Sequence, residues 1–550
     1  MILSHILIFF VSIILISLSA SGYGRIIDLN TKKNFFLDIF LGFTIISFII
    51  TLLHFFLKIN LLISFLIFIF GILAFFFKKN ISLEKLFQTR SIFLLIIIFF
   101  FIPIFISQKY HEDFGYYHLP YALSFIEEKI IFGFANIDKS YVYNSIWLNL
   151  YSIFFLSDRN FNFLTLPSFL LFLNVILFST NQIISKDKKL VSDYFLLIIL
   201  FYFILKFTRI SEFGVDLPAA IFCSLTFYYF LKFSEIDFID EKRDYFFLVS
   251  IFAIFSILIK FSTILLVFLP TFLYIKYFKD LSFDILRLRF FFIYSFLLVF
   301  LIQQFIYSGC LFFPSNFSCL NVSWFNEENI NLSRQLGLIN KGYYSLAKDI
   351  YTPEEYLKNL TWLSFWFKRN LIEILEHLAT ASLPVLLFLF FQKKKIENKL
   401  VLNEKIGIYF FLILGLLFWL HFSPVYRFAI HLFLILIFVI LIGFLITKNF
   451  SKKVFLIFLM TFIFFSFSKN VIRLNKVENI FLGVQKIENK YLLNEKNINQ
   501  LVKIYRPDIK NNSINGWQGR LCWDIPFICS YNSLGVKKKN GYLIINKLKN

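Results

Sequence analysis

The sequence contains few charged residues, and this scarcity excludes most soluble architectures. Only 16% of the 550 residues are Asp, Glu, Lys or Arg, whereas a soluble domain averages about a quarter. It also has no P-loop, no dinucleotide-binding glycine pattern, no HExxH motif and no internal repeat. Because those motifs build nucleotide and zinc sites, their absence argues against a nucleotide-driven cytoplasmic mechanism.

The chain is instead rich in apolar residues, which make up 59% of it and include 83 phenylalanines. Each membrane-spanning helix needs roughly 20 mostly apolar residues, so the sequence predicts an all-α polytopic membrane protein with about 14 transmembrane helices. The expected spans are 2–20, 35–56, 60–77, 91–106, 162–184, 190–207, 216–233, 245–259, 261–278, 290–308, 372–391, 406–421, 428–446 and 453–468.

The basic residues predict the orientation of these spans. No basic residue precedes the first span, and Arg25, Lys32 and Lys33 follow it, which is the reverse of a cleaved signal peptide. The first span is therefore expected to be a retained helix with its N-terminus outside. The other basic loops then share one side, the cytoplasm. These basic loops account for the net charge of +21, so the charge is not taken as a sign of nucleic-acid binding.

This topology places five polar regions on the outer side, 107–161, 208–216, 309–371, 422–427 and 469–550, and it divides the chain in two. The outer loops are 107–161 and the long loop 309–371, both within a transmembrane domain of residues 1–468. Residues 469–550 form a small outer C-terminal segment. This assignment of the loops to two sides requires residues 245–278 to form a hairpin that turns at Lys260. One long tilted helix is the alternative, and it would reverse the side of every later loop.

Four of the five cysteines form two closely spaced pairs on the outer side, where disulfides persist. The pairs Cys310/Cys319 and Cys522/Cys529 therefore predict two small disulfide loops, although four free thiols fit the same spacings. No histidine lies near either pair, which argues against a metal site. Cys223 lies inside a span and is expected to be a buried apolar residue.

The outer segment His111–Tyr121 combines two carboxylates, two histidines and three tyrosines directly after an apolar span. Glu112 or Asp113 would act as a general base that removes a proton from an acceptor hydroxyl or amine. The same carboxylates suit a divalent cation, or they merely end a helix as a solvated charge pair. Tyr117 and His118 are expected to contact substrate, or to be plain interfacial side chains.

Three further clusters on the outer side are candidates for substrate binding. Residues 208–218 pack Arg209, Glu212 and Asp216 between two spans, where polar groups usually line a cavity; a salt-bridged turn is the alternative. Lys260 and Arg427 would neutralise a phosphate, or they anchor the chain at the interface by snorkelling.

Together, Glu112-Asp113 in the early outer loop, Lys260 after its apolar run, residues 309–314, and Pro424 with Arg427 resemble the GT-C superfamily of integral membrane glycosyltransferases. The resemblance covers roughly residues 60–440. It implies a bacterial inner-membrane enzyme whose site faces the periplasm and which takes a polyprenyl-phosphate sugar as donor. Its acceptor would be a lipid or a cell-envelope glycan. Asp113 would be the catalytic base, and whether a cation is needed does not follow from the resemblance.

Two other classes of function remain open at this stage. A flippase-type transporter predicts ionisable residues near mid-membrane and paired broken helices, whereas the charges here concentrate at the outer ends of the spans. A polymerase or ligase of lipid-linked oligosaccharides suits the long loop 309–371. The early acidic loop favours the glycosyltransferase.

Overall fold

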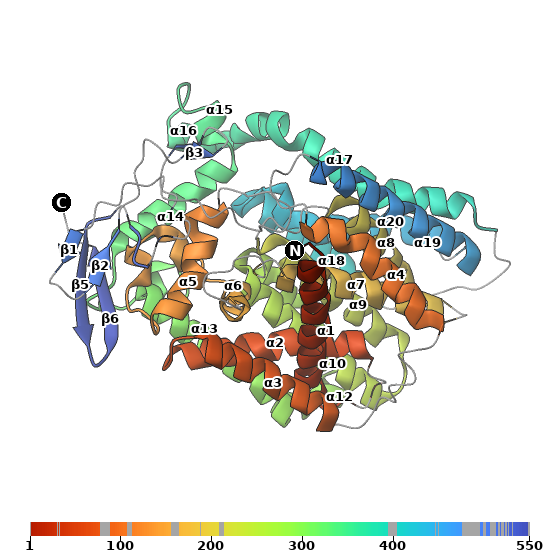
Figure 1. Ribbon diagram of the computed structural model, residues 1–550. Coiled ribbons are helices and arrows are strands. Elements are labelled where there is room, and N and C mark those ends of the chain that lie inside the picture. Colours follow the sequence, from red (N-terminus) through yellow and green to blue (C-terminus); the bar gives the residue numbers. More distant parts are fainter. Residues whose placement is uncertain are drawn as a thin grey trace.

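The structure is a computed structural model in which α-helices make up most of the described chain (Figure 1). It describes residues 2–29, 31, 34–77, 89–106, 113–155, 164, 166–186, 189–207, 214–393, 404–445, 447–448 and 450–475, together with 496–498, 502–505, 513–514, 517–518, 522, 525, 527–530 and 532–547. Helices dominate because a bilayer offers the backbone no water to bond to, so each apolar segment must satisfy its own N–H and C=O groups.

The first group of helices ends before the chain's midpoint. These helices are α1 (Ile2–Ile26), α2 (Phe35–His54), α3 (Leu61–Phe77), α4 (Thr89–Ile106), α5 (Leu119–Glu127), α6 (Ile146–Tyr151), α7 (Leu166–Ser185), α8 (Val191–Lys206), α9 (Asp216–Glu235) and α10 (Ile239–Ile259). The second group comprises α11 (Phe268–Lys276), α12 (Phe278–Leu281), α13 (Leu288–Ser308), α14 (Glu327–Asn340), α15 (Tyr343–Leu346), α16 (Pro353–Leu357), α17 (Trp362–Phe390), α18 (Lys405–Phe422), α19 (Ile430–Leu445) and α20 (Lys452–Leu474).

Nine helices within the described residues are long and apolar enough to cross a membrane, and a tenth is added if the bent pair Phe261–Lys276 and Phe278–Leu286 is one span. This makes the chain a multi-pass helical membrane protein, but the count is lower than the expected fourteen. The difference lies in segments that are short or, like α10, begin with several charged residues. For example, α8 has 16 residues, about 24 Å at 1.5 Å per residue, which is less than the roughly 30 Å of a hydrocarbon core.

The hairpin predicted at Lys260 is confirmed. Helix α10 ends at Ile259, and Lys260 adopts an extended backbone before the 3₁₀ segment η7 (Phe261–Val267) leads into α11. The rings of Phe246 and Tyr274 stack with centroids 6.3 Å apart. Because these residues lie near the start of α10 and the end of α11, the two helices must run side by side in opposite directions.

A layer of loops and short helices, which we call the loop layer, joins regions distant in sequence around Asn136. Its side-chain amide donates to the carbonyl oxygens of Trp324 and Ile545, both at 2.9 Å. Asn329 of α14 donates to the Asn136 side-chain oxygen at 3.1 Å. The loop after α4, the loop before α14 and the C-terminal segment therefore form one packed layer.

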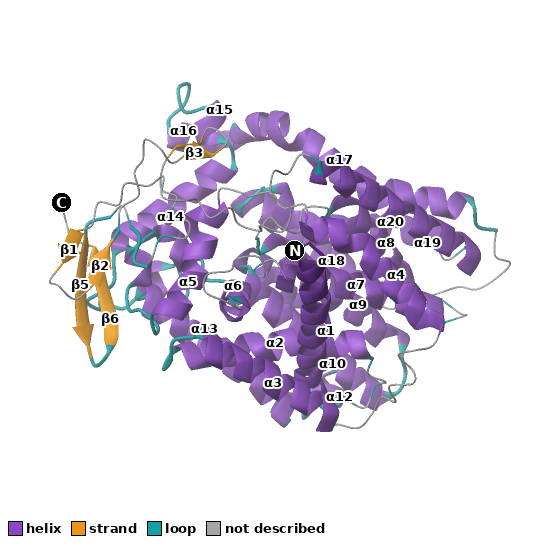
Figure 2. Ribbon diagram, viewed as in Figure 1, coloured by secondary structure: helices purple, strands orange, loops and turns teal. Residues whose placement is uncertain are grey.

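The C-terminal segment contributes the strands. Of these, β1, β2, β5 and β6 lie at one edge of the molecule, and β3 lies apart from them near α15 and α16 (Figure 2). They form three antiparallel pairs: β1 (Lys496–Ile498) with β2 (Val502–Ile504), β3 (Ser513–Ile514) with β4 (Trp517–Gln518), and β5 (Leu534–Lys539) with β6 (Tyr542–Lys547). These hairpins are a small departure from the expected all-α fold. They lie outside the helices that are apolar enough to cross a membrane.

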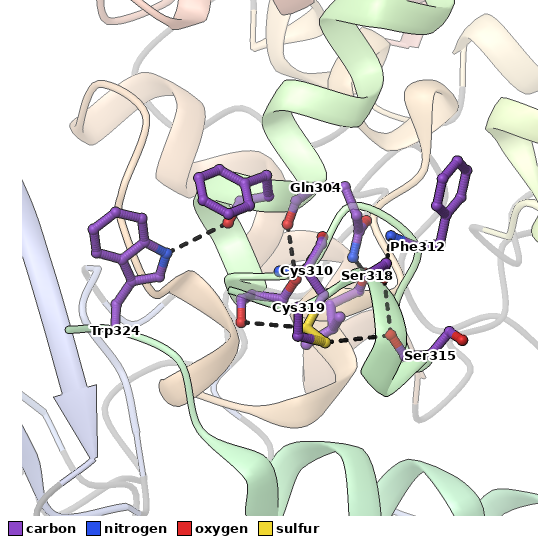
Figure 3. Close-up of a disulfide and its surroundings, with 10 residues drawn as sticks. Gln304, Cys310, Phe312, Ser315, Ser318, Cys319 and Trp324 are labelled. Atoms are coloured by element: carbon purple, nitrogen blue, oxygen red, sulfur yellow. Dashed lines mark hydrogen bonds between the residues drawn. A yellow bond between two sulfur atoms is a disulfide. The ribbon is translucent and has the colours of Figure 1, made fainter. Parts of the chain in front are cut away.

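Both predicted cysteine pairs are bonded in the structure, Cys310 to Cys319 and Cys522 to Cys529. Figure 3 shows the first, which closes a tight loop directly after α13. Within that loop the Phe312 N–H donates to the Ser318 hydroxyl at 2.9 Å. The remaining cysteine, Cys223, is buried with its thiol free, as expected for an apolar residue inside a span.

Candidate functional site

A cavity of about 1740 Å³ opens among the ends of the helices where the loop layer meets them. Its apolar walls come from η7, α13 and α18, and α14 contributes Ser333, Gly337 and Asn340. The amide of Asn340 donates to the Ser423 hydroxyl at 2.7 Å, which ties α14 to the turn before α19. Among the described residues, the ionisable side chains that line it are Asp113, Tyr116, Tyr117, His118, Tyr143, Lys206, Asp216, Lys260, Glu376, His377, Tyr426, Arg427, His431, Lys469 and Arg473.

The acidic motif reaches the cavity through a single π-helical turn, η2 (Phe114–His118), which follows Asp113 and continues into α5. Such turns are rare and are often found at functional sites. Tyr116 donates its hydroxyl to both Asp138 carboxylate oxygens, at 2.9 and 3.0 Å. This bond fixes the turn, so that Asp113, Tyr117 and His118 line the cavity.

The electrostatics of this turn keep the Tyr117 phenol protonated. Burial raises the pKa of Tyr117 well above its ordinary value, and the carboxylates of Asp113 and Asp216 raise it further, while Arg427 lowers it. A protonated phenol is a hydrogen-bond donor. Tyr117 can therefore donate to an oxygen of a bound substrate and is unsuited to act as a base at neutral pH.

Asp216, Lys260 and Arg427 meet in one ionic group, although they come from three distant segments. The Lys260 ammonium contacts one oxygen of Asp216, and the Arg427 guanidinium lies 3.5 Å from the other. The ammonium also lies 3.3 Å from the centre of the Phe428 ring, a cation–π contact. Two cations therefore share the Asp216 carboxylate. Asp113 is within electrostatic range of both cations.

The structure therefore brings together Asp113, Tyr117, His118, Asp216, Lys260 and Arg427, a set that we call the Lys260 cluster. The other predicted site residues, Glu112, Arg209 and Glu212, lie outside the described residues. Of the disulfide cysteines, Cys310 directly precedes the cavity-lining residues 311–314. The Cys522 N–H donates to the Gly115 carbonyl at 2.9 Å, so the C-terminal loop is attached to the turn that carries Asp113.

Sequence reasoning missed a second polar group in the same cavity, which we call the Lys469 cluster. It consists of Lys206, Glu376, His377, Lys469 and Arg473. Lys206 and Glu376 form an ion pair at 2.5 Å, and His377 hydrogen-bonds the Tyr202 hydroxyl at 2.5 Å. The signal was present in Glu376 and His377, since adjacent ionisable residues within a predicted span usually mark a functional position.

Metal binding finds little support in the residues that the structure describes, where no group of three or more His, Cys, Asp or Glu side chains is placed to hold an ion. Asp113 and Asp216 line the same cavity, but Asp216 is already engaged by two cations. The arrangement suits an anionic ligand better than a cation.

Long apolar helices with a charged cavity at their ends define this protein as a multi-pass membrane protein with a polar cavity. The chain belongs to the family described as "Domain of unknown function (DUF8201)", whose profile matches residues 1–434. The matched region contains the whole Lys260 cluster, whereas Lys469 and Arg473 lie beyond it. No curated protein and no solved structure matches the chain.

Proposed function

We propose that the protein is an integral membrane glycosyltransferase of the GT-C type. It would transfer a sugar from a polyprenyl-phosphate donor to a lipid or cell-envelope glycan acceptor. The observation that carries the proposal is the Lys260 cluster, in which a carboxylate on the early outer loop shares one cavity with two cations from distant helices. A reaction that needs both a base and a stabilised phosphate leaving group requires these two features together.

In this mechanism Asp113 removes the proton from the acceptor hydroxyl or amine as that group attacks the anomeric carbon. The bond between the anomeric carbon and the phosphate oxygen breaks, and the configuration inverts. The electron pair leaves with the polyprenyl phosphate, whose growing negative charge lies beside Lys260 and Arg427. Cations fixed where charge develops lower the barrier without reorganising. Asp216 holds both cations in position.

The proposal keeps the topology expected from sequence. Adding α3, α4, α8, α10 and the η7–α11 segment to the nine long helices gives about fourteen crossings. The cavity then faces the periplasm of a bacterial inner membrane, because the basic loops take the opposite side. The early outer loop, the long loop and the C-terminal segment would all be periplasmic, consistent with their packing into one layer.

The test measures release of polyprenyl phosphate from a panel of labelled polyprenyl-phosphate sugars by purified protein in proteoliposomes. We expect release by the wild type and a loss of about 10²- to 10⁴-fold in Asp113→Asn, the usual contribution of a general base. Asp240→Asn is the matched control, since Asp240 is 68% exposed at the far end of α10. No release from any donor by folded protein, or full activity in Asp113→Asn, would contradict the proposal.

A further inference from the structure

Part of the cavity lining consists of neutral polar side chains, to which the proposed mechanism gives no role. These side chains come from the 3₁₀ segment η4 (Lys139–Val142), the residues directly after it, and α13. We call them the Asn144 wall, and they are Ser140, Tyr143, Asn144, Ser145 and Gln304.

A network of buried amides fixes the orientation of Asn144. Its side-chain nitrogen donates to the Gln303 oxygen at 3.3 Å, and that oxygen also accepts from Asn149 at 3.3 Å. Gln303 is itself oriented, because its nitrogen donates to the Tyr307 hydroxyl at 3.1 Å. Asn144 therefore turns its nitrogen toward the protein and keeps its side-chain oxygen for another donor.

Gln304 is fixed in the same way. Its side-chain nitrogen donates to the Val142 carbonyl oxygen at 3.1 Å, and a carbonyl can only accept. Within the part of the chain that the structure describes, no protein group bonds Asn144 Oδ1 or Gln304 Oε1. Both residues line the cavity at 9% and 6% exposure, and neither oxygen is enclosed by protein. Since polar groups at such depth are normally hydrogen-bonded, both oxygens are placed to meet a ligand.

The rest of the wall supplies hydrogen-bond donors and an apolar ring surface. The Ser145 hydroxyl accepts from the Trp147 N–H at 3.3 Å, which leaves its own proton to donate. Tyr143 meets Phe313 edge to face with ring centroids 5.9 Å apart, and both line the cavity. Burial raises the pKa of Tyr143, and a hydrogen bond to Ser333 opposes this only in part, so the phenol stays neutral.

This combination suits an uncharged sugar ring. Sugar hydroxyls both donate and accept, so they can satisfy the amide oxygens and the Ser145 hydroxyl together. A carboxylate only accepts, and it would face the oxygens of Asn144 and Gln304 without a proton between them. An ammonium would be desolvated with no carboxylate in the wall to pair with it, which is costly.

The Asn144 wall is also joined to the turn that carries Asp113. Asp138 accepts from the Tyr116 hydroxyl of that turn and, at 2.8 Å, from the backbone N–H of Ser140. One carboxylate therefore holds both the turn with the proposed base and the start of the wall.

We propose that the Asn144 wall binds the sugar ring of the donor and that this sugar is uncharged. The inference rests on the proposed glycosyltransferase function for the word donor, and on the hydrogen-bonding groups of the wall for the choice of an uncharged ring. The donor phosphate would lie at Lys260 and Arg427, and the sugar hydroxyls would meet Asn144 and Gln304.

The experiment measures equilibrium binding of labelled farnesyl phosphate esters to the purified full-length protein in neutral detergent micelles, without any acceptor. The reference is the cyclohexyl ester, which has a six-membered ring without hydroxyl groups. The glucose, galactose and mannose esters carry uncharged sugars, and the glucuronate and glucosamine esters carry charged ones. We expect at least one uncharged sugar ester to bind about tenfold or more tightly than the cyclohexyl ester. Both charged esters should bind more weakly than that ester.

Two variants test the wall itself. Asn144→Leu roughly keeps the side-chain volume and removes its hydrogen-bonding groups, so the advantage of the sugar ester should shrink by about tenfold. Gln304→Leu should act in the same way. Binding of the cyclohexyl ester should stay unchanged in both variants, which reports that the protein is folded. Lys260→Met should instead weaken all esters by a similar factor, because they share the phosphate.

Asn321→Leu is the matched control, since Asn321 is exposed in the loop before α14 and does not line the cavity. The proposal is overturned if no uncharged sugar ester binds more tightly than the cyclohexyl ester. It is also overturned if a charged ester binds as tightly as the best uncharged one. A third contrary result is that Asn144→Leu and Gln304→Leu weaken the cyclohexyl ester as much as the sugar ester, or weaken neither.

This binding result does not depend on turnover. Preferential binding of an uncharged sugar ester by a protein that transfers no sugar would retain the Asn144 wall as a sugar site and refute the glycosyltransferase. Transfer of a charged sugar would do the reverse. In an active enzyme, Asn144→Leu should lower kcat/KM for the donor by about tenfold and leave the KM for the acceptor unchanged.

Discussion

The two ends of helices α9 and α10 use the same charged residue types in opposite ways. At the cavity end, Asp216 begins α9 and Lys260 follows α10, and both face open space. At the other end, Asp244 is fully buried, with Arg289 at 2.5 Å and the Thr31 N–H at 2.8 Å. Glu235 similarly accepts from the backbone and hydroxyl of Ser192.

The presence of an ion pair therefore does not by itself distinguish a functional site from a structural contact. Asp284 at the closed end contacts three cations, Arg243, Arg287 and Arg289, whereas Asp216 contacts two. What distinguishes the two ends is the space around them. The closed network joins α10 to the segments before α2 and α13, whereas the open one lines a cavity of about 1740 Å³.

The largest effect is expected from breaking the closed end. Asp244→Ala leaves Arg289 without one of its two carboxylate partners and the Thr31 N–H without an acceptor, at a cost of about 3–5 kcal/mol in the free energy of unfolding. Denaturant unfolding in detergent measures this loss. Asp240→Ala, at an exposed position on the same helix, should change stability little. If Asp244→Ala and Asp240→Ala lost equal amounts of stability, the buried ion pair at the closed end would not be a structural contact of special importance.

The open end should behave in the opposite way. Lys260→Met removes a group placed beside the leaving phosphate, so transfer should fall by about 10²-fold or more, while unfolding changes far less than in Asp244→Ala. Transfer assays and unfolding curves on the same preparation test this. Lys58→Met is the control, because the Lys58 side chain pairs with Glu128 at an exposed position. A stability loss as large as that of Asp244→Ala would make Lys260 a structural residue.

An intermediate effect is expected at the C-terminal disulfide. The N–H of Cys522 holds the Gly115 carbonyl, and that of Phe527 donates to the Glu127 carboxylate at 2.9 Å. Cys522→Ser/Cys529→Ser should cost about 2 kcal/mol, the loop-closure contribution of a short loop. It should also lower transfer by loosening the turn that carries Asp113. The double variant Cys310→Ser/Cys319→Ser is the comparison and should lose a similar amount of stability. If neither double variant changes the rate of transfer, the C-terminal loop does not support the site.

The smallest effect concerns Tyr117 at high pH. Because its pKa is raised in the folded protein, the neutral phenol contributes stability that is fully present below the unfolded pKa of about 10. That contribution is lost as pH rises through the higher folded value. In Tyr117→Phe the melting temperature should therefore fall less steeply above pH 10 than in the wild type. Near pH 7 the melting temperatures of the two proteins should be the same. An identical alkaline profile in both proteins would contradict the assignment.

Much of the fold followed from local patterns. Apolar runs predicted the long helices, the need to keep the basic loops on one side predicted the hairpin at Lys260, and the cysteine spacings anticipated both bonded pairs. The exact number of crossings did not follow, because helices such as α8 are too short to be identified as spans by length and composition alone. The hairpins of the C-terminal segment were missed as well, since short strands carry little periodicity.

The candidate site divides in the same way. Asp113, Asp216, Lys260 and Arg427 were recognisable because each interrupts or ends an apolar run, where an ionisable residue carries a desolvation cost and therefore usually has a role. Lys469 and Arg473 gave no such signal, since a cation at the end of a span is also the ordinary pattern of topology.

The sequence by itself determined that this is a multi-pass helical protein and which residues interrupt its apolar segments, because composition and hydropathy act locally along the chain. The tertiary structure was needed to show that Asp216 and Lys260 border a cavity, whereas Asp244 and Arg289 form a buried ion pair between packed helices. That choice depends on how helices hundreds of residues apart leave or fill space between them, and no local pattern records it.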